Sequence, residues 1–127
     1  LCSNVKIFAD VLVKHARPLG EQNLMTVVQE TIERGLADGV IISGRATGSP
    51  PSLEDLELAM AAAAGTPVFI GSGANWKNIS TLMQAADGVI VSSSLKRHGK
   101  TDQPIDPIRV SQFVEATRWA ISNKGKD

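Results

Sequence analysis

The chain has 127 residues, of which 43% are hydrophobic, 20% charged and 4% aromatic, and its 13 basic residues balance its 13 acidic ones. Such a composition is typical of one globular domain and excludes a disordered chain, while the zero net charge disfavours a general nucleic-acid binder. No apolar run reaches the roughly 20 residues of a membrane span. The single cysteine, Cys2, cannot form an internal disulfide, so we expect a protein of the reducing cytoplasm.

Strands and helices are predicted to alternate along the chain. Short apolar runs rich in β-branched residues predict strands at 5–10, 39–43, 67–71 and 88–92. Apolar residues at helical spacing predict helices from Leu24 to a stop at Gly35, from a cap at Ser52 to about Gly65, from a cap at Asn75 through Met83, and from a cap at Asp106 to about Ser122. Because a helix follows every strand, we expect an α/β fold with a parallel sheet.

The chain also contains a short internal repeat. Residues 37–43 (ADGVIIS) and 86–92 (ADGVIVS) differ at one position, and they open the second and fourth strands. There are two explanations for the repeat. Either the two segments are alike by chance, because α/β strands draw on few residue types, or the chain has a repetitive βα architecture such as the eight-stranded TIM barrel. That barrel takes roughly 250 residues. With half the length and half the strands, the sequence predicts a single half-barrel domain over 1–127, a (βα)4 half of a TIM barrel.

Two loops are predicted to form a phosphate site. Ligands of parallel α/β sheets bind at the carboxyl ends of the strands. The third strand ends in two glycines around a serine and runs into a predicted helix N-terminus, and the fourth ends in a serine run before a basic cluster. The alternative is a tight turn beside a solvated basic loop. The candidate phosphate ligands are Gly71, Ser72, Gly73, Ser92, Ser93, Ser94 and Lys96.

The first loop carries the candidate catalytic residues. Asp10 lies at the carboxyl end of the first predicted strand, where a carboxylate can act as a general acid or base. A structural pairing with Lys6 or Lys14 is an equal alternative for it. Lys14 and His15 follow on the same loop, and an imidazole can transfer a proton near neutral pH, although a lone histidine more often serves only as a surface or hydrogen-bonding residue.

Further ligand candidates lie in the second loop, where Arg45, Thr47 and Gly48 precede two prolines. Arg45 would hold an anion, or alternatively form an exposed salt bridge.

The sequence contains neither a Walker-type nor a full dinucleotide-binding glycine motif, and no Cys or His spacing typical of a metal site. We therefore expect no metal and no cofactor.

Three segments carry a resemblance to a known family. VKIFADVLVKHARPLG, GVIISGRATGSPPSLEDLELA and TPVFIGSGANWKNISTLMQAADGVIVSSSLKRHGK together resemble the carboxyl-terminal half of the BtpA family, which is named for a protein of photosystem I biogenesis and is similar to ribulose-phosphate-binding TIM barrels. The resemblance implies that the four strands correspond to barrel strands five to eight. It also implies that 71–73 and 92–94 occupy the family's phosphate-binding position.

Whether the protein is an enzyme stays open at this stage. As an enzyme it would be a sugar-phosphate isomerase or lyase with Asp10 as the acid or base. The alternative is a non-enzymatic assembly or scaffold protein that retains the barrel fold. A flavodoxin-like receiver domain is a third hypothesis, disfavoured because the second strand ends in Ser43 and Gly44 without a phosphoacceptor aspartate. An open half-barrel also predicts a partner, either an identical chain in a homodimer or a complementing half-barrel.

Overall fold

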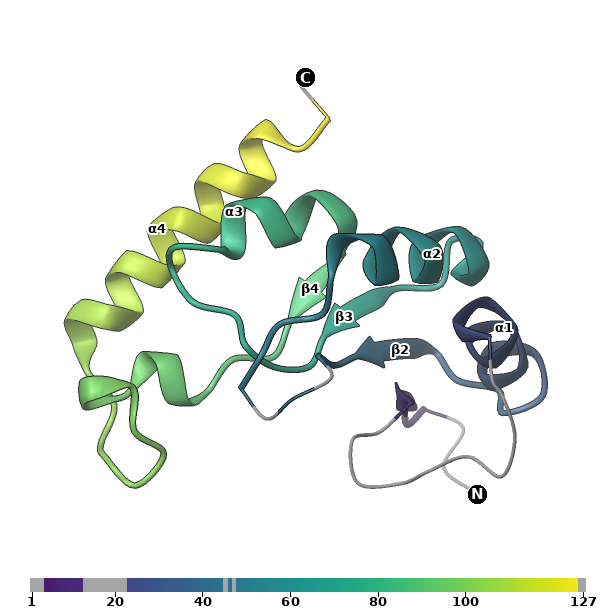
Figure 1. The fold of residues 1–127 in the computed structure, drawn as a ribbon, viewed down its shortest axis with the longest axis horizontal. Coiled ribbons are helices and arrows are strands. Elements are labelled where there is room, and N and C mark those ends of the chain that lie inside the picture. Colours follow the sequence, from purple (N-terminus) through teal and green to yellow (C-terminus); the bar gives the residue numbers. More distant parts are fainter. Residues whose placement is uncertain (1–3, 13–22, 45, 47, 126–127) are drawn as a thin grey trace.

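The computed structural model describes residues 4–12, 23–44, 46 and 48–125. Its strands are β1 (Phe8–Val11), β2 (Gly39–Ile42), β3 (Val68–Ile70) and β4 (Gly88–Val89). Its helices are α1 (Leu24–Glu33), α2 (Leu53–Ala63), α3 (Ile79–Leu82) and α4 (Pro107–Asn123), with short 3-10 turns η1 (Met83–Ala85), η2 (Ser93–Leu95) and η3 (Arg97–Gly99). The predicted alternation of strands and helices is therefore confirmed (Figure 1). No helix within the described ranges is long and apolar enough to cross a membrane.

The four strands form one parallel sheet in the order β1-β2-β3-β4. Figure 1 shows the helices gathered along one side of this sheet. A flavodoxin-like domain instead places its first strand inside the sheet and covers both faces with helices. The strand order therefore excludes the receiver hypothesis.

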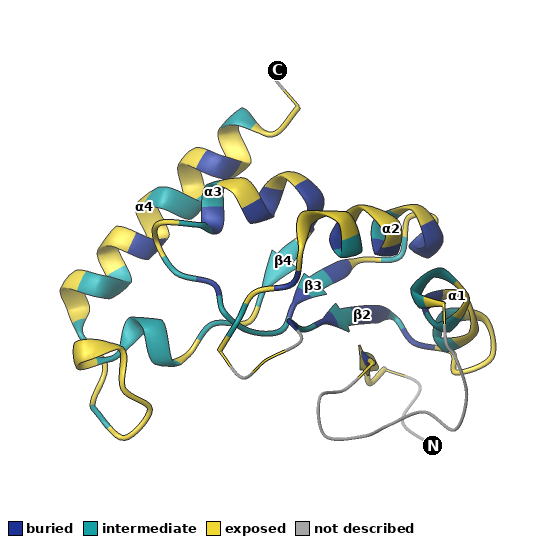
Figure 2. Ribbon diagram, in the orientation of Figure 1, coloured by how far each residue is buried: buried dark blue, intermediate teal, exposed yellow. Residues whose placement is uncertain are grey.

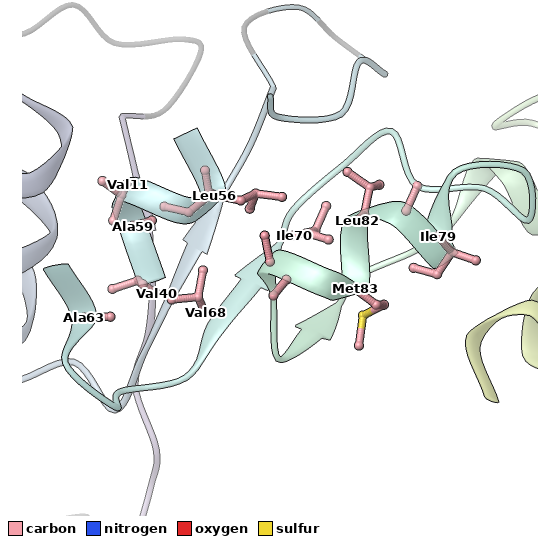
Figure 3. Packing of buried hydrophobic residues seen from close by; sticks show 14 of the residues in the cluster. Val11, Val40, Leu56, Ala59, Ala63, Val68, Ile70, Ile79, Leu82 and Met83 are labelled. Atoms are coloured by element: carbon pink, nitrogen blue, oxygen red, sulfur yellow. The ribbon is translucent and has the colours of Figure 1, made fainter. Parts of the chain in front are cut away.

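One face of the sheet is buried under the helices. Alternate strand residues point to this face, and Val40, Val68 and Ile70 are fully buried there (Figures 2 and 3). Leu56 of α2 and Ile79 of α3 are also fully buried and join them in one hydrophobic cluster. Burying a side chain of this size stabilises the fold by about 1.5–3 kcal/mol. The core thus lies between the sheet and the helices, and it holds the strand ends in place.

The predicted helix start at Leu24 and two of the three predicted caps are confirmed, and the third cap is wrong. The side chains of Ser52 and Asp106 cap α2 and α4, accepting hydrogen bonds from the backbone N–H groups of Asp55 and Ile108. The helix expected from Asn75 instead begins at Ile79.

The late start of α3 has a local cause. The Asn75 side chain accepts a hydrogen bond from the Lys77 N–H, and the Asn78 side chain accepts one from the Asn75 N–H. These bonds hold 75–78 in a turn, because asparagine side chains compete with the helix for backbone donors.

Two strands also differ from their predicted bounds. β1 lies later in the chain than the predicted 5–10, and β4 is shorter than the predicted 88–92.

The internal repeat has the same structural role in both copies. The Asp38 carboxylate accepts hydrogen bonds from the Ile7 N–H at 2.9 Å and from Lys6 Nζ at 2.8 Å. The Asp87 carboxylate accepts one from the Val68 N–H at 3.0 Å. Each aspartate thereby ties the start of its own strand to the preceding strand. The shared geometry favours a repetitive architecture over chance coincidence.

A second feature recurs with the repeat. Phe8 pairs with Gly39, and a Cβ atom on Gly39 would lie 2.6 Å from the Phe8 ring. Phe69 pairs with Gly88, and a Cβ atom there would lie 2.4 Å from the Phe69 ring. The two rings pack edge to face with their centroids 5.1 Å apart. Each glycine therefore makes room for the aromatic ring of the strand before it.

These rings belong to the sheet face opposite the helices, which we call the open face. It comprises Phe8, Asp10, Gly39, Ile41, Phe69, Gly88 and Ile90, placed by alternation along the strands. Phe8 and Ile90 are each 49% exposed. Apart from the Asp10 carboxylate, the open face is therefore apolar and accessible.

The pairing of Asp38 predicts a defined pH dependence of stability. Its pKa is lowered from the ordinary 3.8, chiefly by the hydrogen bond from Lys6 and then by that from the Ile7 N–H. The ionised Asp38 carboxylate therefore stabilises the folded state. This stabilisation is present above pH 3.8 and is lost as the pH falls through the lowered pKa. In urea unfolding, wild type should exceed Asp38→Asn in stability at pH 7, and this difference should shrink below pH 3.8. Glu115→Gln on α4 is the control, and an equal Asp38→Asn effect at pH 7 and pH 2.5 would contradict the assignment.

Candidate functional site

A cavity of about 610 Å³ opens at the carboxyl ends of β3 and β4. The segments that follow these two strands form most of its wall, and the start of α4 closes one side. The lining residues are Gly48, Gly71, Ser72, Gly73, Ala74, Asn75, Trp76, Lys77, Ile90, Val91, Ser92, Ser93, Ser94, Gly99, Thr101 and Arg109. Every predicted phosphate ligand except Lys96 therefore lies around one cavity.

Hydrogen-bond donors remain available along this wall. Among the described residues, the backbone N–H groups of Gly73, Ala74 and Ser93 donate to no protein oxygen. The hydroxyls of Ser92 and Ser93 likewise have no protein partner within the described part of the chain. Unpaired backbone and hydroxyl donors at a strand end suit the oxygen atoms of an anion.

Other serine hydroxyls hold the loops together. Ser94 Oγ donates to the Ala74 carbonyl at 2.8 Å and so joins the loop after β4 to the loop after β3. Ser72 Oγ donates to the Ser49 carbonyl at 3.2 Å and joins the loop after β3 to the loop after β2. These two side chains shape the cavity by fixing its walls.

Gly73 is required by the packing of two loops. Its φ is +77°, and a Cβ atom there would lie 2.1 Å from the backbone nitrogen of Pro50. Only glycine fits this combination of a left-handed backbone and close approach. The sequence argument assigned the glycine to the approach of a ligand, whereas the close neighbour in the structure is the loop after β2.

The cations at the cavity differ from the predicted ones. Lys96 does not line the cavity, because its Nζ donates to the Thr101 carbonyl. Arg109, in the first turn of α4, lines it instead and donates from Nε to the Ser94 carbonyl at 2.9 Å. Lys77 also lines it, with Nζ 5.5 Å from the centroid of the Trp76 ring. Arg109 was missed because it lies beyond the basic cluster in sequence, although a helix that follows a βα loop starts at the same end of the sheet.

The expected helix dipole is absent from the site. α3 has four residues and begins at Ile79, beyond the Gly71–Lys77 segment of the cavity wall. A helix this short supplies too small a dipole to attract an anion. Charge in the cavity therefore comes from Lys77 and Arg109.

Asp10 lies near the cavity but outside its wall. It is exposed on β1, and Ser43 Oγ lies 3.5 Å from its Oδ1 at the limit of a hydrogen bond. A Cβ atom on Gly71 would lie 2.4 Å from the same Ser43 oxygen, so Ser43 stands between Asp10 and the cavity. The structural pairing of Asp10 with Lys6 is not formed, because Lys6 bonds Asp38.

The remaining predicted residues divide into two groups. Gly48 lines the cavity with φ at +76°. Lys14, His15, Arg45 and Thr47 lie outside the described residues. Within the described ranges, no group of three or more His, Cys, Asp or Glu side chains could hold a metal ion.

Comparison with known proteins identifies the family. The BtpA family model matches residues 1–119, and the chain belongs to that family. It is 68% identical over 124 residues to the photosystem I biogenesis protein BtpA of Synechocystis sp. (strain ATCC 27184 / PCC 6803 / Kazusa), covering 98% of this chain and 43% of that protein. It is 43% identical over 116 residues to an uncharacterized protein of Methanocaldococcus jannaschii, covering 90% of this chain and 42% of that one. The chain spans less than half the length of the curated relatives it matches.

A solved structure shows the same fold. The chain is similar to N-(5'-phosphoribosyl)anthranilate isomerase from Pyrococcus furiosus, with a TM-score of 0.57 and 20% sequence identity. The match covers 91% of this chain and 52% of the isomerase. Because that isomerase is a TIM barrel, the chain has the predicted fold, a (βα)4 half of a TIM barrel.

The loop packing predicts different costs for two glycine substitutions. Gly73→Ala should lower the free energy of unfolding by about 3 kcal/mol, because a positive φ and a backbone clash with Pro50 act together. Gly48→Ala should cost only about 1 kcal/mol, since its φ is similar but, among the described residues beyond its chain neighbours, no atom lies within 4 Å of the new Cβ. Urea unfolding measures both, and equal costs would refute the packing role of Gly73.

Proposed function

We propose that this member of the BtpA family binds a phosphorylated or otherwise anionic small molecule in the cavity at the ends of β3 and β4. The observation that carries the proposal is the convergence of unpaired donors and cations on one cavity. Gly73 and Ser93, whose backbone N–H groups donate to no protein oxygen among the described residues, line the same cavity as Lys77 and Arg109. Such charge-assisted hydrogen bonds are about twice as strong as neutral ones.

Arg109 is the residue best suited to orient the anion. Its Nε donates to the Ser94 carbonyl, which restricts the orientation of the guanidinium. The two terminal nitrogens keep donors in a planar fork, and such a fork matches two oxygens of a phosphate or carboxylate. Lys77 adds a mobile positive charge from the rim beside Trp76.

The similar isomerase supports the ligand class only in general terms. Its name gives a phosphoribosyl compound as its substrate. We extend to this chain the broader class of phosphorylated small molecules. The proposal requires neither a cofactor nor a metal ion.

Under this proposal the protein is a sugar-phosphate isomerase or lyase in which Asp10 is the general acid or base. Ser43 lies against Gly71 of the cavity wall and its hydroxyl reaches toward Asp10 on β1, so a ligand anchored at Arg109 would extend toward them. Lys14 and His15 follow Asp10 in the chain and are proposed to assist it. Arg45 and Thr47, next to Gly48, are proposed to contact the rest of the ligand.

The second candidate is a non-enzymatic assembly or scaffold protein that retains the fold. It is favoured by the Synechocystis relative, whose name refers to the biogenesis of photosystem I. Both candidates share the remaining proposals: a single half-barrel domain, a cytoplasmic location, and a homodimer or complementing half-barrel as partner.

Anion binding should depend on the cations of the cavity. In a Trp119→Phe background, Trp76 reports on the cavity, and titration with inorganic phosphate or ribulose phosphate should change its fluorescence. Arg109→Met and Lys77→Met should each weaken binding by about tenfold or more. Lys96→Met, which removes a charge outside the cavity, should leave affinity within about twofold. Binding that weakens only in Lys96→Met would place the site elsewhere.

Turnover should separate the two candidate functions. If the protein is an enzyme, Asp10→Asn should abolish turnover of its sugar phosphate while leaving the fold and the phosphate affinity intact, because the two side chains are nearly isosteric. Product formation is measured across a panel of sugar phosphates, with circular dichroism as the check on folding. Full activity in Asp10→Asn would remove the acid-base role, and a wild type that binds but never turns over would favour the scaffold.

A further inference from the structure

The cavity at the ends of β3 and β4 has an aromatic part that the anion site does not use. Its volume of about 610 Å³ falls within the roughly 300–1,000 Å³ of pockets that hold a whole small molecule, and such pockets combine a few polar groups with apolar walls. The largest apolar side chain on the wall is the indole of Trp76, and 45% of this residue is exposed. The ring is therefore available to the part of a ligand that is not the anion.

Trp76 follows an inner strand of the sheet rather than an edge strand. It lies in the segment after β3, and β3 pairs with β2 on one side and with β4 on the other. The strands that flank this segment thus belong to this chain. The place of the ring on the cavity wall is set by those strands.

Asparagine side chains hold the backbone around Trp76. The Asn78 side chain accepts a hydrogen bond from the Asn75 N–H at 2.8 Å and donates one from Nδ2 to the Gly73 carbonyl at 3.0 Å. The Asn75 side chain accepts one from the Lys77 N–H at 2.9 Å. These three bonds close the segment 73–78 into a turn. The ring thus projects from a restrained backbone, and a surface that is ordered beforehand loses less entropy when a ligand binds.

The same turn brings two neighbouring side chains together. In a helix, consecutive side chains point about 100° apart and do not face each other. Here Lys77 Nζ lies 5.5 Å from the centroid of the Trp76 ring, within the roughly 6 Å of a cation–π contact. A positive charge and an aromatic surface therefore lie side by side on the cavity wall. A ligand with an anionic group and a planar ring would contact both.

The ring also lies within one small molecule's length of an anion donor. Trp76 is three residues from Gly73, whose N–H donates to no protein oxygen in the described part of the chain. Three residues span at most about 11 Å between Cα atoms when fully extended, and a turn makes this distance shorter. A ligand that binds its phosphate at Gly73 can therefore reach the indole with a group at its other end.

We propose that the ligand of this cavity is a phosphate ester that carries a planar aromatic or heteroaromatic ring, and that this ring stacks on the Trp76 indole. The proposal rests on the proposed function, because the phosphate would bind the donors and cations of that anion site, and it narrows the class of ligand. Stacking of a base on an aromatic side chain raises affinity by about tenfold or more, and it tolerates different rings because each has a π face. Trp76 then selects phosphate esters with a ring over those without one.

Isothermal titration calorimetry of the full chain tests the proposal with AMP, ribose 5-phosphate and adenosine, which carry both groups, the phosphate alone and the ring alone. Wild type should bind AMP about tenfold or more tightly than ribose 5-phosphate. Trp76→Leu should abolish this preference without weakening ribose 5-phosphate, and Trp76→Phe, which keeps a planar ring, should retain most of it. Trp119→Leu is the matched control, because Trp119 is an exposed tryptophan of α4 that does not line the cavity. It should leave the preference unchanged.

The outcomes separate the ring from the anion site. Equal affinities for AMP and ribose 5-phosphate in wild type overturn the stacking proposal and leave the anion site standing. A preference for AMP that persists in Trp76→Leu with unchanged circular dichroism, or that is lost in Trp119→Leu instead, overturns it as well. Adenosine that binds through Trp76 while ribose 5-phosphate does not bind refutes the anion site but supports stacking on the indole. A protein that binds none of the three probes refutes both.

Discussion

Hydrophobic packing of one sheet face against its helices is the constraint on which the rest of the structure depends. Val40, Val68 and Ile70 are fully buried beneath α2 and α3, and a shift of one residue in any strand would turn such side chains to the opposite face. The register is thereby fixed. Fixed register determines where β3 and β4 end, and the loops that form the cavity begin at those ends.

The described parts of three cavity loops are fastened to one another. Ser94 binds the Ala74 carbonyl, Ser72 binds the Ser49 carbonyl, and Gly73 packs on Pro50. Donors held in this way would lose little conformational freedom on binding the proposed anion. The serine and glycine residues of these loops thus divide into two groups, since some shape the wall and others keep donors without a protein partner among the described residues.

The sequence predicted what depends on local pattern. Strand–helix alternation and the caps at Ser52 and Asp106 are local signals, and the half-barrel follows from them. Asn75 was misread as a cap because Asn78, three residues on, competes for the same backbone. Arg109 was missed for a different reason. Its place at the cavity depends on how α4 returns to the loop after β4, and no local pattern records that contact.

The repeated Asp and Phe–Gly pairs have a consequence for folding. Each pair of strands, β1 with β2 and β3 with β4, has its own ring over a glycine and its own aspartate hydrogen bond. The contact from Val68 to Asp87 spans 19 residues, and that from Ile7 to Asp38 spans 31. A shorter closing loop costs less entropy and brings faster contact. The carboxyl-terminal pair therefore closes at the lower entropic cost, and the cavity loops follow the two strands of that pair.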